Sequence, residues 1–303
     1  TLGANAGVGD NGILNKATFN NNTGGDISID RSSNIGLLNQ AGSFTNAAKI
    51  TIGSNASVGT IGIFNDAIFN SITGGDINVN KTTTFSIINQ NGEFTNAATI
   101  TVGEIGNGGL WNKSIFNNNA CGKILLKRGK LLVSSGHTYA NTGFTHVIEE
   151  LENEGTFTNN GVLKYGSTTG NPVINTTDSS VIVNDTLSTI FSYGGTFNGT
   201  VNGIFTDEAD TVSAGTYLID GDVDFIAACN LPSGTQTLYA SITPSSCNTP
   251  VIVPFLYNNV VASPTDLLTW TGAVSTAWNE ACNWSPVGIP TATNDVVIPG
   301  GVS

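Results

Sequence analysis

Two clusters of acidic residues have the types and spacing that could support chemistry in this sequence. They are Asp207, Glu208 and Asp210, followed by Asp220, Asp222 and Asp224 within the segment IDGDVDF. A pair of carboxylates can supply the acid and the base that cleave a glycosidic bond. The clusters therefore raise the question of whether the chain degrades polysaccharides.

Histidine and arginine, which such sites use to move protons or to neutralise developing charge, are scarce in this chain. It contains only His137, His146, Arg31 and Arg128, and no segment concentrates them. A catalytic site is a local departure from a repeat, whereas the repeats described below are nearly interchangeable. We therefore expect no catalytic residues and no enzyme activity.

The second acidic cluster suggests a metal site. If Asp220, Asp222 and Asp224 occupy alternate positions of one strand, their carboxylates project to the same face. Calcium takes about six to eight oxygen ligands, so three carboxylates could bind it weakly. The alternative is a solvated acidic face, and no other cofactor is expected.

The four cysteines are Cys121, Cys229, Cys247 and Cys282, and none has the CxxC spacing of a zinc site. Cys229 and Cys247 flank a hairpin-like segment, and we expect them to form a disulfide. The sequence leaves the pairing of Cys121 and Cys282 open. A disulfide implies an oxidising, extracytoplasmic compartment.

The composition is polar without being charged. Charged residues make up 11% of the 303 residues, against about 25% in an average soluble domain, and the net charge is −12. This charge disfavours nucleic acid as a partner, because phosphate binding requires a basic surface. The one basic run, GKILLKRGK at 122–130, is typical of a solvated strand edge that resists aggregation. No apolar stretch approaches the roughly 20 residues of a membrane-spanning helix.

The elements that must position these side chains follow from an internal repeat. Residues 42–53 read GSFTNAAKITIG and residues 92–103 read GEFTNAATITVG, and aligning 1–50 with 51–100 gives 26 identities. The unit divides further, because asparagine recurs at Asn15, Asn39, Asn65, Asn89 and Asn112, each followed by a phenylalanine at Phe19, Phe44, Phe69, Phe94 and Phe116. The period is about 24 residues, in alternating shorter and longer versions.

Each unit predicts three short strands. Apolar and polar residues alternate with a period of two, β-branched residues dominate, and glycine pairs such as Gly24-Gly25 suit tight turns. Three strands of four or five residues with their turns use about 24 residues, which is one coil of a parallel β-helix. We therefore predict an all-β parallel β-helix, or β-solenoid.

Stacking of the coils in register explains why the segment at 42–53 is repeated at 92–103. A residue that occurs once per coil lies above its own copy, so asparagines can exchange amide hydrogen bonds and phenylalanines can fill the interior. A second asparagine in each unit is expected to do the same, at Asn20, Asn46, Asn70, Asn96 and Asn117. The repeated residues are therefore predicted to be structural.

The pattern weakens along the chain and predicts three parts. Residues 1–225 are expected to form the solenoid, with regular coils over 1–130 and degenerate coils over 131–225. Residues 226–268, which contain two cysteines and five prolines, are expected to form a small β segment that caps the last coil. Residues 269–303 would begin a further module. Because residue 1 lies partway through a repeat, we expect the chain to be a segment of a longer protein.

Residues 269–301 contain a distinctive phrase, TWTGAVSTAWNEACNWSPVGIPTATNDVVIPGG. Its characteristic residues are Trp270, Gly272, Trp278, Asn283, Trp284, Pro286, Pro290, Asp295 and Pro299. This phrase resembles a segment that recurs in very large secreted surface proteins of the Bacteroidetes, and the repeats before it resemble the solenoid repeats of the same proteins. Many of those proteins are adhesins, so the resemblance implies an extracellular or cell-surface location.

We therefore expect a non-enzymatic extracellular protein, a rigid solenoid segment of a large cell-surface adhesin or fibre. Its partners would be cell-surface or matrix glycans, proteins, or other copies of the chain. A polysaccharide-binding or polysaccharide-degrading β-helix is one alternative. Ice binding is another, but it requires a Thr-x-Thr pair in every coil, and the pair Thr99 and Thr101 is preceded by Lys49 and Thr51.

Overall fold

The computed structural model describes most of the chain and divides it into two compact units. It describes residues 9–176, 181–183, 189–193, 199–220, 222–227, 231–244, 247–259, 267–272 and 275–300, apart from residue 107. At 104–106, 181, 189–193, 217–220 and 222–227 it describes the backbone alone. The first unit contains residues 1–183, 192–200 and 243–251, and the second contains the remaining residues.

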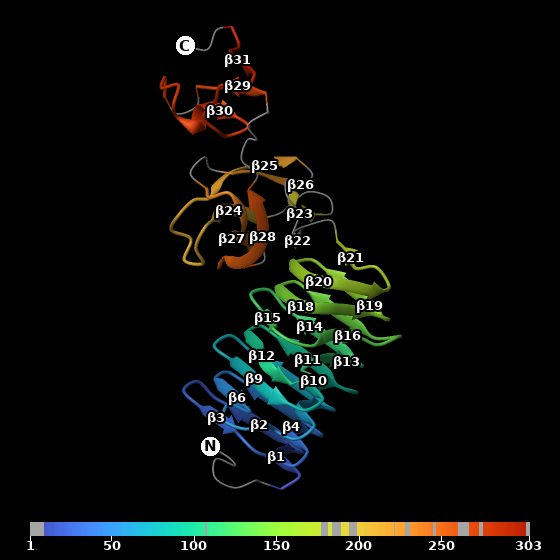
Figure 1. The fold of residues 1–303 in the computed structure, drawn as a ribbon. Helices are drawn as coiled ribbons and strands as arrows, with labels where there is room; N and C mark the ends of the chain where they lie inside the picture. The colour runs from blue at the N-terminus through green and yellow to red at the C-terminus, as the bar shows by residue number, and fades with distance from the viewer. Residues whose placement is uncertain are drawn as a thin grey trace. The chain divides into compact units, whose positions relative to one another are not determined.

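The first unit is a parallel β-solenoid of about seven turns with three faces, which confirms the predicted fold class (Figure 1). The first face consists of β1 (Asn11–Asn15), β4 (Ile35–Asn39), β7 (Ile61–Asn65), β10 (Phe85–Asn89), β13 (Gly109–Asn112) and β16 (Lys130–Val133). The second face consists of β2 (Thr18–Asn21), β5 (Ser43–Asn46), β8 (Ile68–Ser71), β11 (Glu93–Asn96), β14 (Ile115–Asn118), β17 (Thr138–Asn141), β19 (Thr156–Asn159) and β21 (Ile174–Asn175). The third face consists of β3 (Asp26–Ile29), β6 (Lys49–Ile52), β9 (Asp76–Thr82), β12 (Thr99–Gly106), β15 (Lys123–Leu126), β18 (Phe144–Asn153), β20 (Val162–Gly170) and β22 (Val181–Val183).

The interior is filled by one stack of aromatic rings and by aliphatic side chains from all three faces. The seven rings are Phe19, Phe44, Phe69, Phe94, Phe116, Tyr139 and Phe157, with neighbouring centroids 4.5–5.0 Å apart and nearly parallel planes. The spacing matches the distance between paired strands, about 4.8 Å. Tyr139 replaces phenylalanine without leaving its hydroxyl unpaired, because that oxygen lies 3.1 Å from the Thr145 hydroxyl.

The predicted asparagine ladder runs along the corner between the first and second faces. Each side-chain amide donates to the next carbonyl oxygen, at 2.7–2.9 Å, through Asn15, Asn39, Asn65, Asn89 and Asn112. Asn65 also donates to the carbonyls of Ala67 and Glu93, and its own side-chain oxygen accepts from the Ala67 amide. The ladder therefore satisfies turn backbone as well as linking coils.

A second ladder runs along the corner between the second and third faces, in a register that differs from the prediction. Its members are Asn21, Asn46, Asn96, Asn118, Asn141, Asn159 and Asn175. Asn20, Asn70 and Asn117 are instead paired in register with Thr45 and Thr95, one position earlier. Ser71 occupies the ladder position between Asn46 and Asn96, and it interrupts the amide chain.

The lengths of the corners explain why the sequence repeats every fifty residues although the coil is half as long. Four residues join β2 to β3 (22–25) and β8 to β9 (72–75), whereas two residues join β5 to β6 (47–48) and β11 to β12 (97–98). Alternate coils therefore have different turns and different sequences.

The length of the connection at the corner between the third and first faces also changes from coil to coil. Eight residues (53–60) join β6 to β7, but only three (127–129) join β15 to β16. In β18 the corner is reduced to an irregularity between Val147 and Glu150, after which Leu151 pairs with Leu131 of the first face. Strands β18 and β20 therefore each contribute residues to the third face and to the first face.

The strands after β22 differ from the degenerate coils that were expected up to residue 225. β24 (Gly199–Phe205) joins β27 (Gly234–Pro244) and β28 (Val251–Asn259) in a separate three-stranded sheet. β25 (Gly215–Asp220) and β26 (Asp222–Ala227) form an antiparallel hairpin. The expected boundary at residue 225 therefore falls inside β26, and the last described parallel pairings of solenoid coils are those of β21 and β22.

The phrase at 269–301 forms a small sheet of β29 (Leu268–Trp270), β30 (Trp284–Ser285) and β31 (Val296–Val297). Trp284 packs edge-on against Trp270 and Trp278, with centroids 5.0 and 4.5 Å away. The buried Asn283 side chain donates to Ser275 Oγ and to the Ala277 carbonyl. Three of the characteristic residues, Trp270, Asn283 and Trp284, are therefore buried in this small fold.

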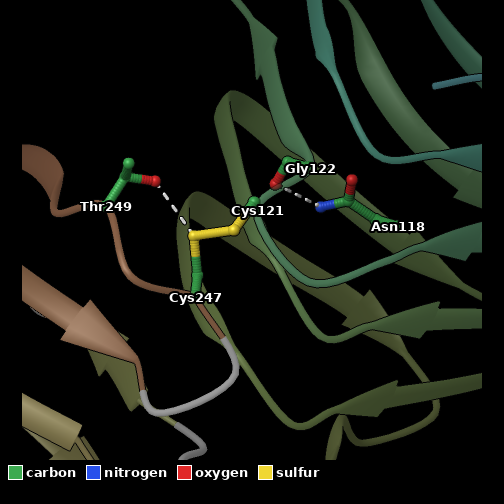
Figure 2. The surroundings of a disulfide bond; sticks show 5 residues. All are labelled: Asn118, Cys121, Gly122, Cys247 and Thr249. Carbon is green, nitrogen blue, oxygen red and sulfur yellow. Dashed lines mark hydrogen bonds between the residues drawn. A yellow bond between two sulfur atoms is a disulfide. The ribbon is translucent and has the colours of Figure 1, made fainter. Parts of the chain in front are cut away.

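The predicted Cys229–Cys247 disulfide is wrong, because Cys247 is bonded to Cys121 (Figure 2). Cys121 lies in the turn between β14 and β15, and segment 243–251 belongs to the solenoid unit. Their Cα atoms are 5.1 Å apart, within bridging range, although 126 positions separate them in sequence. The short spacing of Cys229 and Cys247 was a poor guide because a solenoid brings distant segments together. Cys282 is also disulfide-bonded, and Cys229 lies outside the described residues.

Candidate functional site

The outer surface of the first face carries a row of apolar side chains. The residue before each ladder asparagine points outward, because the residue before that one belongs to the core. In five successive coils this outward residue is apolar, and in the sixth coil Leu132 occupies the same position before Val133. Each residue of this row pairs in register with the next: Leu14, Leu38, Phe64, Ile88, Trp111 and Leu132. A neighbouring column adds Ile35, Ile61 and Phe85. We call these nine residues the apolar band.

The apolar band is accessible along most of its length. Leu14 is 46% exposed, and Leu38, Phe64, Phe85, Trp111 and Leu132 are partly exposed. Ile88 is buried at 6%. The band ends where Leu132 pairs with Glu152, which in turn pairs with Thr169. A contiguous apolar surface with a polar end is typical of an interaction site.

Two aromatic residues of the band form a cluster. The Phe85 and Trp111 rings have centroids 5.2 Å apart and are tilted by 38°. The indole Nε1 of Trp111 donates to Ser134 Oγ at 2.8 Å, and Lys113 Nζ lies 4.0 Å from the centre of the indole ring. The hydrogen bond and the cation–π contact hold the indole in one orientation.

A hollow of about 400 Å³ lies beside this cluster, at the corner between the third and first faces. We call it the corner hollow; it is lined by Phe85, Gly108, Gly129, Lys130, Glu149, Glu150 and Ser167. Gly129 has a φ of +72°, and a Cβ on it would lie 1.6 Å from the Gly108 carbonyl oxygen. The hollow therefore exists because two stacked glycines replace side chains there.

Charged groups on the rim of the corner hollow are held by other parts of the chain. Glu149 accepts the backbone N–H of Gly129 at 3.0 Å, and Glu150 accepts the Thr169 hydroxyl at 2.8 Å. Lys130 forms an ion pair with Glu152. The hydrogen bond from Lys130 to Glu152 raises the pKa of Lys130, with a smaller contribution from the charge of Glu150. Lys130 therefore remains cationic at neutral pH.

A second hollow at the same corner has a different lining. Its volume is about 310 Å³, and its residues are polar or glycine: Ser54, Asn78, Asn80, Lys81, Thr101, Gly103 and Lys127. It includes one residue of the basic run at 122–130, which spans the corner between β15 and β16. No aromatic ring lines this second hollow among the residues described there. The two hollows therefore offer different surfaces on one corner.

One residue of the first acidic cluster, Asp207, has a structural role. Asp207 accepts hydrogen bonds from the amides of Thr211 and Val212 and from the Thr211 hydroxyl. The Thr211 hydroxyl bond, together with these backbone bonds and against the opposing effect of burial, lowers the pKa of Asp207. Asp210 adopts a positive φ of 58° in the same turn. The carboxylate of Asp207 is thus occupied in closing a turn.

The second predicted cluster lies on two strands. Asp220 ends β25, Asp222 begins β26 and is paired with Asp220, and Asp224 is paired with Leu218. The expected single strand does not match this hairpin. The side chains of these three residues lie outside the described ones, so the calcium site stays a prediction. Elsewhere in the described chain, no group of three His, Cys, Asp or Glu side chains is placed to hold a metal.

The two histidines and the threonine pair occupy separate places. His137 lies in a turn before β17, whereas His146 is buried on β18 with its ring 6.2 Å from Phe144. Thr99 and Thr101 pair with Asp76 and Asn78 on one side. Threonine therefore does not recur at these two positions in the neighbouring coil of the third face, as the sequence predicted.

Sequence reasoning missed the apolar band and the corner hollow. A signal for the band was available, since two apolar residues precede each ladder asparagine, as in LLN, IFN, IIN and LWN. Adjacent residues of a strand face opposite sides, so one of each pair must face outward. The hollow left no such signal, because its residues come from five coils with different lengths.

Comparisons with family models, with curated proteins and with solved structures returned no significant match. Within the described part of the chain, no helix combines the length and the apolar character needed to cross a membrane. The functional argument therefore depends on the geometry of this chain.

Proposed function

We propose that the chain is a non-enzymatic extracellular adhesive rod, a solenoid segment of a large cell-surface adhesin or fibre. The observation that carries this proposal is the apolar band, which presents one kind of surface over six coils. A soluble domain seldom exposes a row of large apolar side chains unless a partner covers it.

Stiffness is the second element of the proposal. In a solenoid each coil contacts mainly its neighbours, so continuous interactions along the axis determine how the rod resists bending. Here those interactions are the stack of seven rings and the two asparagine ladders. A rigid rod keeps the outward residues of successive coils in fixed positions, which favours binding to an extended partner.

An extracellular location is supported by the disulfide between Cys121 and Cys247, since disulfides persist in oxidising compartments. The resemblance of the phrase at 269–301 to bacterial surface proteins agrees with this location. We propose surface glycans, matrix proteins or other copies of the chain as the partners of the band.

Adhesion can be tested with beads that carry the purified chain. We expect the beads to resist flow on surfaces coated with bacterial or host extracellular matrix. Changing Leu38 and Phe64 to serine should weaken attachment, because it removes the apolar band at two adjacent coils. Attachment that is unaffected by this double change would contradict the proposal.

A matched control is available on the second face. Thr45 and Asn70 are also outward, partly exposed and adjacent in register, but they are polar. Changing both to serine should leave attachment as it was. Thermal unfolding of each variant would show that the fold is intact.

A further inference from the structure

We propose that the corner hollow, together with the Phe85–Trp111 cluster, is a binding site for a neutral glycan. The inference rests on the proposed adhesive function and names the chemical class of one partner. It is carried by a cavity, an aromatic wall, and oriented polar groups of both signs.

The shape of the corner hollow suits a short linear ligand. Continuing the register of Ile87 with Leu110 places Phe85 level with Gly108, and that of Gly109 with Lys130 places Gly108 level with Gly129. Gly129 then contacts Glu149 through its amide. From Phe85 to Glu149 the corner hollow extends over three successive strand spacings, roughly 14 Å along the axis.

The floor of the corner hollow is backbone. Gly108 and Gly129 have no side chains, and the clash that any Cβ on Gly129 would make with the Gly108 carbonyl shows how closely the two coils approach. A ligand can therefore lie against the main chain between an aromatic end and an acidic end. Pockets of this kind combine apolar walls with a few fixed polar groups.

The aromatic end fits the apolar side of a sugar ring. The C–H groups on one side of a pyranose ring pack against an aromatic face, which carries partial negative charge. Phe85 lines the corner hollow directly, and Trp111 extends the aromatic surface with an indole already fixed by Ser134. A ring so fixed loses little conformational entropy when a ligand binds.

The polar end fits hydroxyl groups. Glu149 and Glu150 are each oriented by accepting one hydrogen bond, from the Gly129 N–H and the Thr169 hydroxyl respectively, and a carboxylate has further lone pairs to accept hydroxyl protons. Lys130, whose ammonium group has donors beyond its ion pair with Glu152, supplies donors on the same lining, and Ser167 Oγ, which donates to the Glu149 carbonyl, can accept a ligand hydroxyl. Bonds to charged groups are stronger than bonds between neutral ones.

The mixture of charges favours a neutral ligand. An anionic ligand would meet Glu149 and Glu150, while a cationic one would meet Lys130 on the lining and Lys113 over the Trp111 ring. Each charged class is therefore repelled by one part of the site. A polyhydroxylated neutral ligand can both donate to the carboxylates and accept from the ammonium group.

The test is native affinity electrophoresis of the whole chain in gels containing galactomannan, xyloglucan or mixed-linkage β-glucan. We expect at least one neutral polysaccharide to retard the protein, and Phe85→Ala and Glu150→Gln each to weaken that retardation about tenfold. Ile115→Ala and Glu93→Gln are controls, an exposed apolar residue of the second face and an exposed glutamate, both outside the hollow and the apolar band, and both should be retarded like the parent chain. Quenching of tryptophan fluorescence by the same polysaccharide gives a second readout at Trp111.

Polygalacturonate and chitosan serve as anionic and cationic comparisons. The inference is overturned if no neutral polysaccharide retards the chain, if only a charged one does, or if Phe85→Ala and Glu150→Gln are retarded as strongly as the parent. Phe85→Leu provides a gentler variant should the alanine variant unfold. Bead attachment separates the two proposals: if Phe85→Ala still attaches while no glycan binds, the adhesive function stands and the glycan site does not.

Discussion

Two corners of the solenoid contain asparagine ladders, and the described residues of the third corner form none. At the two ladder corners a buried amide links most neighbouring coils, with an interruption at Ser71, and the turn lengths vary by only a few residues. At the third corner, between the third and first faces, the connection has five residues between β3 and β4, eight between β6 and β7 and three between β15 and β16, and in β18 it is only a bulge. Each coil therefore has two corners whose connections are nearly constant in length and one corner whose connection varies in length.

The difference shows what stacking constrains. A side chain that bonds to its own copy must occur at the same position in every coil, so its corner cannot easily change length or residue type. A corner without such bonds can change freely, and the glycines and charged residues of the corner hollow are located there. The variable corner is thus where a solenoid can acquire binding specificity without loss of its core.

The largest expected effect compares the interior with the exterior of one coil. Phe69→Ala should lower the free energy of unfolding by about 3–5 kcal/mol, because it leaves a cavity between Phe44 and Phe94 in the ring stack. Phe64→Ala, an outward and partly exposed residue of the same coil, should cost well under half as much. Urea denaturation of both variants measures the difference, and equal losses would show that the ring stack is not a special source of stability.

The next effect compares a ladder amide with an outward amide. Asn65→Ala should cost on the order of 1–3 kcal/mol, since Asn39 loses its acceptor and Asn89 its donor within a buried corner. Asn70→Ala removes an outward asparagine and should change stability by no more than about 0.5 kcal/mol. Thermal unfolding followed by circular dichroism gives both values, and a costly Asn70→Ala would remove the distinction between the two positions.

Sequence periodicity predicted the constant corners and the core, because their residues recur once per coil. It did not fix the register of the second ladder at Asn20 and Asn21, where consecutive asparagines make the spacing ambiguous. It could not pair Cys121 with Cys247, since only folding brings segment 243–251 to the solenoid. The corner hollow escaped prediction for a related reason, as its coils differ in length.

A repair of the second ladder should give a smaller effect of opposite sign. Asn46 Nδ2 and Ser71 Oγ are buried without hydrogen-bond partners, because serine is too short to continue the chain to Asn96. Ser71→Asn should reconnect the amides and raise the free energy of unfolding by about 1 kcal/mol. Calorimetry of the variant measures this, and a lower melting temperature would mean that the serine fits a space too small for an amide.

The smallest expected effect is a pH-dependent link at the third corner. Asp30 accepts hydrogen bonds from Ser54 Oγ at 2.6 Å and from the backbone and side-chain nitrogens of Asn55 at 3.0 and 2.9 Å. The Ser54 bond, with those from Asn55 and against the opposing effect of burial, lowers the pKa of Asp30 below its ordinary value of 3.8. A carboxyl whose pKa is lower in the folded than in the unfolded chain stabilises the fold above the unfolded pKa, and this contribution is lost as the pH falls through the folded pKa.

Asp30→Asn therefore provides a test of whether this single link matters as the ladders do. The variant should be less stable than the parent at pH 7, and the difference should shrink as the pH is lowered from about 5 to below 3.8. Urea denaturation at several pH values measures both chains under the same conditions. A difference that is constant across this range would mean that the charge of Asp30 contributes nothing. A difference as large as that of Asn65→Ala would mean that the variable corner is held as firmly as the ladder corners, and the contrast between them would fail.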